Sequence, residues 1–287
     1  MDLSIRHRTT FVYEGKAHES VNEARLRPLD DATQVCRDFT LSVTPDADPR
    51  AYEDFYGNTV HYFEVFGHHT SLTVEATSIV ATTPTDERPP VPIVSWEDLQ
   101  RSPDREMLAE FYSPTQYVPL DDAFRTEAED ALAGGPTDVW ADVRRLGEYI
   151  NWRFTYMPMV TGVETPANRA LELRRGVCQD FAHVHLGLCR SLGLPTRYVS
   201  GYFFNDKRPE REAEASHAWI EAWLPDFGWV AYDPTHAREA DERYVKIATG
   251  RDYADIRPVS GTYRGAPTRV LEVDVEVRVG SGNLIRT

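Results

Sequence analysis

The sequence predicts an α+β fold in which an N-terminal antiparallel β domain precedes a core of helices packed on an antiparallel sheet. Three observations support this fold. The first ~80 residues alternate with the period of strands, three stretches between residues 104 and 153 and the stretch between Gly176 and Gly193 have helical patterns, and strand patterns return after Pro195. We therefore divide the chain into a β-rich domain (1–83), a proline-rich linker or crossing segment (84–103), a core (104–265) and a C-terminal β-strand segment (266–287).

Composition limits the classes of function. The 287 residues include 31 Lys and Arg against 46 Asp and Glu, a net charge of -15 that would repel a nucleic acid. We interpret this acidity mainly as a solubility feature. No apolar run approaches the length of a membrane span, and the first residues lack the apolar region of a signal peptide, so we expect a cytoplasmic protein. Nothing in the composition identifies an oligomeric state.

The N-terminal region has the alternation of a half-buried strand from its first residues. Leu3, Ile5, His7, Thr9, Phe11 and Tyr13 share one parity, and later runs such as "RDFTLSVTP" and "SLTVEATSIVAT" are rich in β-branched residues. This pattern predicts an antiparallel sheet or small sandwich with a structural or docking role. At the other end of the chain, "RVLEVDVEVRV" predicts a half-buried strand.

Helical patterns fill much of the core. We expect helices over residues 104–111, 121–133 and 137–153, the last capped by Thr137 with Asp138 in its first turn. A further helix of about fourteen residues lies between Gly176 and Gly193. A strand, "TRYVSGYFF", and a charged loop, Asn205 to Ala215, lead from it into a hairpin.

Cys178 lies at the start of that helix. Unpaired backbone N–H groups and the positive end of the helix dipole favour a thiolate there, which makes this cysteine a candidate nucleophile. Cys189 returns to within about 20° of Cys178 around the helix axis but lies roughly 16 Å further along it, which excludes a disulfide and predicts a packed core thiol. With Cys36, the three cysteines form neither a disulfide framework nor a CxxC metal site.

A nucleophilic cysteine needs a base, and His217 is the best placed histidine. His183 and His185 lie on the same helix as Cys178 but face away from the thiol or lie about two turns further on. His217 opens a strand and Asp233 ends the next strand of the same hairpin. A four-residue loop would place these two side chains on opposite faces. An odd loop, of three residues ending in Gly228 or of five, would place them on one face as diagonal neighbours, and we expect odd parity.

Several segments together resemble a known family. "GVCQDFAH", "RYVSGYF", "SHAWIEAWLPDFGWVAYDPTH" and "GRDYADIRPVSGTYRG" resemble the bacterial transglutaminase-like superfamily in its cysteine protease branch, and the opening region with "EARLRP" resembles the N-terminal β region that accompanies this branch. The resemblance implies a papain-like core with Cys178 as nucleophile, His217 as base and Asp233 as acid. Two positions depart from the family pattern: His185 replaces a usual apolar residue, and His236 stands where asparagine is common.

The remaining site residues are less specific. The backbone N–H of Cys178 is the first candidate donor to an oxyanion, and Tyr156, Trp152 or Gln179 is a candidate second donor, with a core aromatic role as the alternative for the first two. We interpret Asp180, in the first helical turn, as support for the helix start.

The sequence thus predicts a cysteine-dependent acyl-transfer enzyme that hydrolyses a peptide or isopeptide amide through a thioester, without a cofactor. Transamidation onto an amine is the alternative within the class. A non-catalytic binding or scaffold module is the alternative outside it, and a zinc site formed by Cys178, His217 and Asp233 is a third possibility, which we rank below a metal-free triad. Trp219 and Trp223 share the strand parity of His217 and either wall the cleft or pack in the hairpin core. The charged loop is either a mobile cleft rim or a plain connector.

Overall fold

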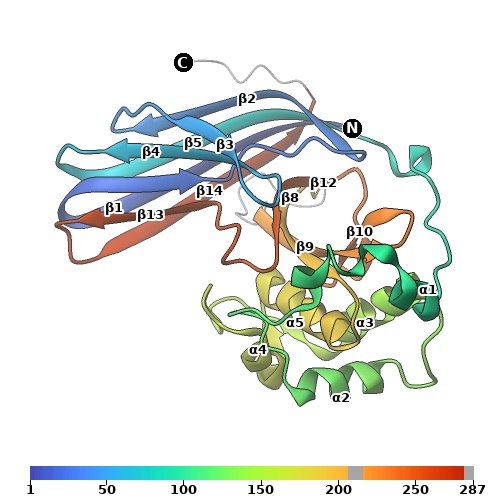
Figure 1. Ribbon diagram of the computed structural model, residues 1–287. Helices are drawn as coiled ribbons and strands as arrows, with labels where there is room; N and C mark the ends of the chain where they lie inside the picture. The colour runs from blue at the N-terminus through green and yellow to red at the C-terminus, as the bar shows by residue number, and fades with distance from the viewer. Residues whose placement is uncertain (206–215, 281–287) are drawn as a thin grey trace.

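The computed structural model describes residues 1–205 and 216–280, and confirms the α+β architecture. Helices gather on one side of a central sheet, and a larger N-terminal sheet packs on the other side (Figure 1). No helix within the described residues is long and apolar enough to cross a membrane.

The N-terminal sheet is organised around one long strand. It comprises β1 (Asp2–Ala24), β2 (Gln34–Thr44), β3 (Arg50–Glu53), β4 (Thr59–Val65), β5 (His69–Thr82), β13 (Val259–Arg264) and β14 (Arg269–Val279). The order is β2-β5-β1-β4-β3, with β13 and β14 also paired to β1. The predicted one-parity row from Leu3 to Tyr13 is buried, as expected for the inner face of a sheet.

The C-terminal strand joins this sheet rather than the core. β14 pairs antiparallel with β1 along its whole length, from Leu3↔Val279 to Tyr13↔Arg269. The prediction of a half-buried strand is only partly right. Val275 and Val277 pack against the N-terminal core, whereas Leu271 and Val273 are exposed.

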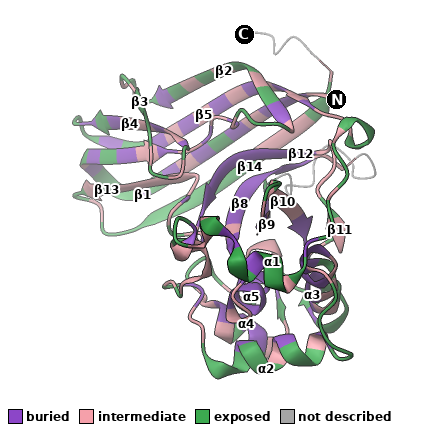
Figure 2. Ribbon diagram, turned by 45° about the vertical axis from the view of Figure 1, so that its right-hand side comes forward, coloured by how far each residue is buried: buried purple, intermediate pink, exposed green. Residues whose placement is uncertain are grey.

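The second unit is a five-stranded antiparallel sheet covered by helices. Its order is β11-β10-β9-β8-β12, formed by β8 (Thr196–Phe203), β9 (Ser216–Leu224), β10 (Gly228–Asp233), β11 (Arg238–Glu239) and β12 (Tyr244–Gly250). The helices are α1 (Trp96–Arg101), α2 (Asp122–Ala131), α3 (Val139–Arg153), α4 (Ala167–Leu173) and α5 (Cys178–Ser191). A short parallel pair, β6 (Thr155–Tyr156) and β7 (Arg175–Gly176), precedes α5. Every described position of α5 from Asp180 to Arg190 is buried, and the helix lies at the centre of this unit (Figure 2).

Two details of the predicted helices are wrong. Residues 104–111 do not form an α-helix but lie among the short 3-10 turns Pro103–Arg105 and Ala109–Tyr112, because packing of Phe111 against Trp229 of β10 holds the segment in a different path. Asp138, not Thr137, caps α3, since its side chain accepts a hydrogen bond from Ala141 N at 3.0 Å. The linker region also contains a 3-10 turn, Thr85–Glu87, besides α1.

Polar contacts fix the two sheets against each other. The side-chain amide of Gln34 both donates to Lys246 O (2.8 Å) and accepts from Lys246 N (2.7 Å), and the amide of Asn58 makes the same double contact with Thr249 on β12. Lys246 Nζ forms ion pairs with Asp31 of the N-terminal region and with Glu221 of β9. Because these groups are mostly buried, the contacts fix one relative placement of the sheets.

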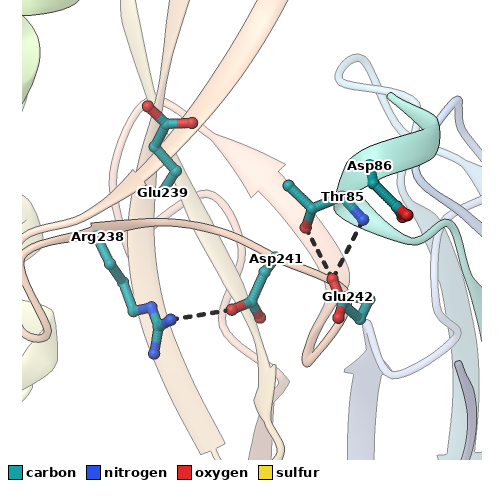
Figure 3. A pocket seen from close by; sticks show the side chains of 6 residues that line it. All are labelled: Thr85, Asp86, Arg238, Glu239, Asp241 and Glu242. Carbon is teal, nitrogen blue, oxygen red and sulfur yellow. Dashed lines mark hydrogen bonds and ion pairs between the residues drawn. The ribbon is translucent and has the colours of Figure 1, made fainter. Parts of the chain in front are cut away.

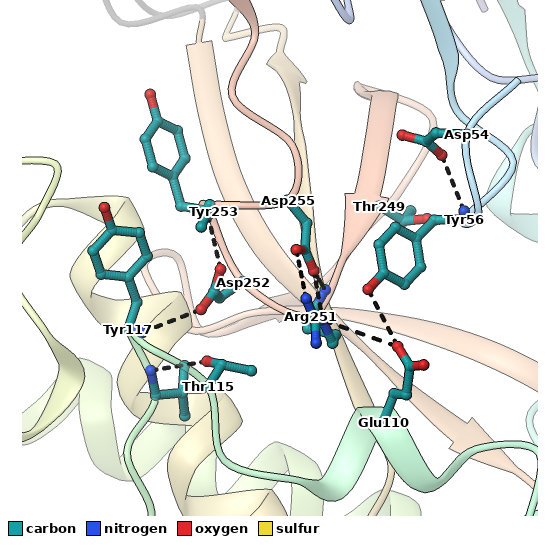
Figure 4. A network of polar contacts seen from close by, with 12 residues as sticks. Asp54, Tyr56, Glu110, Thr115, Tyr117, Thr249, Arg251, Asp252, Tyr253 and Asp255 are labelled. Carbon is teal, nitrogen blue, oxygen red and sulfur yellow. Dashed lines mark hydrogen bonds and ion pairs between the residues drawn. The ribbon is translucent and has the colours of Figure 1, made fainter. Parts of the chain in front are cut away.

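A second polar network spans the same junction. Arg251 pairs with Asp255 at 2.9 Å and lies 4.0 Å from Glu110, to which Tyr56 of the N-terminal region donates at 3.3 Å (Figure 4). Asp252 accepts from the backbone N–H of Tyr117 in the helical unit. The segment after β12 is therefore anchored to both units.

Candidate active site

The start of α5 presents Cys178 as its first residue, as predicted. The side chain of Asp180 accepts hydrogen bonds from the backbone N–H of Val177 (2.7 Å) and from Thr161 Oγ1 (2.7 Å), which fixes the entry of the chain into the helix. Burial raises the pKa of Asp180, while these hydrogen bonds oppose the increase. Cys178 itself is partly exposed and packs against the core of the helical unit.

The hairpin has the odd parity that the candidate triad requires. Leu224 pairs with Gly228 and Trp223 with Trp229, so three residues, 225–227, connect β9 and β10. Gly228 adopts φ 101° and is the first residue of β10, not the last residue of the loop. His217 and Asp233 consequently share a face, and His217 Nε2 lies 2.7 Å from Asp233 Oδ2.

The surroundings of His217 and Asp233 shift the pKa values of both side chains. Burial alone would lower the pKa of His217, but the charge of Asp233 and hydrogen bonds to Asp233 and Cys178 raise it to about 10. Burial alone would raise the pKa of Asp233, but the charge of His217 and the hydrogen bonds from His217 and His236 hold it well below its ordinary value. His217 Nε2 is occupied by Asp233, which leaves Nδ1 for the Cys178 thiol. The three predicted residues thus interact in the order cysteine, histidine, aspartate.

Asp233 has two further side-chain partners. His236 Nδ1 lies 2.6 Å from Oδ2, and the Tyr244 hydroxyl donates to the same oxygen at 2.7 Å. Its other oxygen accepts from the backbone N–H of Thr235 at 2.8 Å. Sequence reasoning placed His236 near the acid but missed Tyr244, which comes from β12 and has no motif to mark it. Together these donors stabilise the carboxylate as an anion of fixed orientation.

Of Trp219 and Trp223, only Trp219 packs against the candidate base His217. Trp219 is buried and its ring stacks against His217 with centroids 6.1 Å apart. This packing is close: a Cβ added at Gly201, the cross-strand partner of His217, would meet Trp219 Cη2 at 2.5 Å and also contact Val245 O. Trp223 instead packs against Trp229 at the far end of the hairpin.

The other groups on α5 have structural contacts. His185 Nε2 lies 3.0 Å from Val143 O, and His183 Nε2 accepts from Tyr253 N at 3.2 Å. Burial lowers the pKa of both imidazoles to about 4, so they are neutral at ordinary pH. Cys189 is fully buried, as predicted, and burial raises the pKa of its thiol. None of the three is placed as the base of Cys178.

The predicted supporting residues lie on the segment before α5 and on its first turn. Gln179 Nε2 donates to Val163 O at 2.9 Å, and Tyr156, which pairs with Gly176, is 39% exposed although the edge of its ring contacts Phe181. Trp152 is 76% exposed, with Arg153 over its ring. The core aromatic alternative is therefore wrong for both Tyr156 and Trp152, and the second oxyanion donor stays a prediction.

Among the described residues, His217, Asp233 and His236 each place a possible metal ligand atom within 4.8 Å of the others. The zinc site considered from the sequence consisted of Cys178, His217 and Asp233, so this set differs from it by containing His236 and not Cys178. In the structure the same atoms are engaged in the hydrogen bonds described above. We therefore treat them as a proton network.

A surface pocket lies beside this network but outside it. Thr85, Asp86, Arg238, Glu239, Asp241 and Glu242 line it (Figure 3). Thr85 donates to Glu242, which ties the linker region to the end of the core sheet, and Arg238 pairs with Asp241 within the core. None of the predicted site residues lines this pocket. Of the charged loop predicted as a cleft rim, residues 206–215 lie outside the described residues.

Comparisons with known proteins agree with the resemblance seen in the motifs. The family model of the transglutaminase-like superfamily matches residues 126–234, which include the three candidate triad positions, and that of the bacterial transglutaminase-like N-terminal region matches residues 3–81. The uncharacterised protein ML0607 of Mycobacterium leprae (strain TN) is 36% identical over 282 residues, which cover 96% of this chain and 98% of that protein.

Two further similarities concern a relative named for its activity and a solved structure. A protein-glutamine gamma-glutamyltransferase of Pseudomonas aeruginosa is 32% identical over 125 residues, 40% of this chain and 19% of that protein. The crystal structure of a candidate cysteine protease from Cytophaga hutchinsonii superposes with a TM-score of 0.74 at 23% identity, and covers 96% of this chain and 90% of that one. The latter similarity extends the shared fold across both sheets.

Proposed function

Because the chain belongs to the transglutaminase-like superfamily, we propose that it is a cysteine-dependent acyl-transfer enzyme that acts on peptide or isopeptide amides. The observation that carries this proposal is the position of His217, whose two ring nitrogens serve Asp233 on one side and Cys178 on the other. A buried imidazole held between a thiol and a carboxylate is the arrangement that thiol acyl transfer requires.

The geometry supports a two-stage reaction. In the first stage the Cys178 proton passes to His217 Nδ1, a transfer that the raised pKa of this imidazole favours, the sulfur attacks the substrate carbonyl, and the C–N bond breaks as His217 returns the proton to the departing amine. In the second stage His217 removes a proton from the incoming acceptor, which attacks the thioester and releases the acyl group. The proton then returns to the Cys178 sulfur, which restores the enzyme.

Asp233 acts as the orienting acid in this scheme. It is fully buried and receives donors from His217, His236 and Tyr244 on one oxygen. Its charge stabilises the imidazolium that forms when His217 takes the thiol proton, and its hydrogen bond keeps Nδ1 directed at the sulfur. The backbone N–H of Cys178 remains the proposed first oxyanion donor.

We propose water as the acceptor, since Cys178 is partly exposed and nothing among the described residues selects an amine. Transamidation is the second candidate, and the similarity to a protein-glutamine gamma-glutamyltransferase of Pseudomonas aeruginosa supports it. A non-catalytic scaffold would keep the fold without needing the cysteine, histidine and aspartate. Their joint placement therefore supports an enzyme.

The test uses an acyl-donor peptide with and without millimolar cadaverine or lysine. We expect a thioester on Cys178 by intact-mass analysis, free acid as the main product, and loss of both in Cys178→Ala. A conjugate that dominates over free acid would replace hydrolysis by transamidation. Complete absence of a thioester with a broad peptide set, in protein whose Cys178 still alkylates, would contradict the enzyme proposal.

A further inference from the structure

The segment between β6 and α4 exposes four large apolar side chains within seven positions. Met157, Met159, Val160 and Val163, which we call the apolar rim, are 37%, 98%, 38% and 55% exposed. Large apolar side chains on a protein surface are ordinary when they are scattered singly, but a contiguous group marks a place of contact. No charged residue lies between Met157 and Val163, although the chain as a whole has a net charge of -15.

The apolar rim is held directly beside Cys178. Met157 N donates to Gly176 O at 2.8 Å, Gln179 Nε2 donates to Val163 O at 2.9 Å, and Thr161 Oγ1 donates to Asp180 Oδ2 at 2.7 Å. The three partner residues, Gly176, Gln179 and Asp180, all lie within two positions of the candidate nucleophile. The hydrogen bonds therefore fix the exposed side chains relative to the thiol.

The backbone conformation of Met159, the most exposed residue of the apolar rim, is energetically unfavourable. Met159 adopts φ 65°, a left-handed conformation that is unfavourable for residues other than glycine. The fold thus maintains a strained turn whose result is a fully solvated methionine next to the candidate active site. Methionine side chains are flexible and polarisable, and they adapt to apolar partners of different shapes.

We propose that the apolar rim is the subsite for an apolar side chain of the acyl-donor polypeptide, next to the residue whose carbonyl Cys178 attacks. This proposal rests on the proposed function and names its substrate class: polypeptides with leucine, methionine or phenylalanine adjacent to the reactive amide. An acidic neighbour is disfavoured because no charged residue lies between Met157 and Val163, so the rim itself offers no cation to pair with a carboxylate that leaves water. The adaptable methionines make the preference broad rather than specific for one side chain.

The test compares peptides that are identical except for Leu, Ser or Glu beside the acyl-donor residue. We expect kcat/KM to be about tenfold higher for Leu than for Ser, equivalent to about 1.4 kcal/mol, and lowest for Glu. In the double variant Met159→Ser, Val163→Ser this ratio falls to about threefold or less. Matched controls are Met107→Ser and Val273→Ser, which change an exposed methionine and an exposed valine elsewhere and keep the tenfold ratio.

Binding of the same peptides to the Cys178→Ala protein, measured by fluorescence anisotropy, requires no turnover and separates the two proposals. If no thioester forms but the Leu peptide binds more tightly and the rim variants remove that advantage, the subsite stands and the enzyme proposal fails. If the rim variants keep the full Leu preference, or if the protein favours Ser or Glu, the subsite is wrong. Sedimentation that shows a dimer dissociated by Met159→Ser would likewise overturn it, because the rim would then be a contact between copies.

Discussion

His217 and His236 contact the same oxygen of Asp233, at 2.7 and 2.6 Å, with their ring centroids 5.0 Å apart. The carboxylate is thus shared between the candidate base and a second imidazole that is open to solvent on one side. Any change at His236 is therefore expected to reach the base through Asp233.

His236→Ala is expected to raise the pKa of His217, because Asp233 loses a competing donor and interacts more strongly with the His217 imidazolium. Tyr244→Phe removes another donor to the same oxygen and is expected to act in the same direction. NMR titration of the His217 ring measures both effects, with His18→Ala as a control in the N-terminal sheet. A decrease in either variant would contradict the shared-carboxylate interpretation.

Cys178 is expected to react selectively with iodoacetamide at neutral pH. Cys189 is fully buried, and burial also raises the pKa of both Cys189 and Cys36. Peptide mapping after limited alkylation should show labelling of Cys178 at least about tenfold faster than that of Cys189. The same measurement on His217→Gln should show slower labelling of Cys178 and unchanged labelling of Cys36. Equal labelling of Cys178 and Cys189 in native protein would exclude a special role for the helix start.

The free energy of unfolding is expected to fall as the pH rises from about 6.5 to about 10. The pKa of His217 is raised from 6.5 in the unfolded chain to about 10 in the folded protein. The stability that protonated His217 contributes is therefore fully present below pH 6.5 and is lost as the pH rises through about 10. The lowered pKa of Asp233 gives the opposite dependence at acid pH, where stability falls below the ordinary value of 3.8.

Urea denaturation across this range measures the alkaline loss, which should be on the order of a few kcal/mol. The His217→Gln protein should have a flatter alkaline limb than the wild type. Parallel curves for the two proteins would show that other groups cause the loss.

Gly201→Ala is expected to destabilise the protein by about 1–3 kcal/mol, because the added methyl would overlap with Trp219 and with Val245 O. Trp219 stacks on His217, so the repacking should also reduce the rate of Cys178 alkylation. Gly67→Ala is the matched control, since a methyl there meets no atom within 4 Å. If Gly201→Ala leaves the free energy of unfolding unchanged, β8 and β12 must be able to move apart here to make room for the methyl group without loss of stability.

The sequence alone predicts the position of a side chain when that position follows from helix or strand periodicity and from loop length. The helix start at Cys178 and the shared face of His217 and Asp233 are of this kind, since both depend on local spacing. Contacts that depend on distant elements are not predictable in this way. Tyr244 reaches Asp233 from another strand, and residues 104–111 lose their helix to packing of Phe111 against Trp229. The exposure of β14 likewise depends on which other segments cover this strand, and the alternation of apolar and charged residues in its own sequence does not show this.

The Lys246–Glu221 ion pair has a consequence for how the protein can be divided. Glu221 lies on β9 with the same parity as His217, and Lys246 also pairs with Asp31 of the N-terminal region. Removal of residues 1–83 would leave Lys246 short of one partner and uncover the buried Tyr202, Val245 and Ile247. The two regions should therefore melt in a single calorimetric transition, and an excised core (residues 104–265) should aggregate rather than fold by itself.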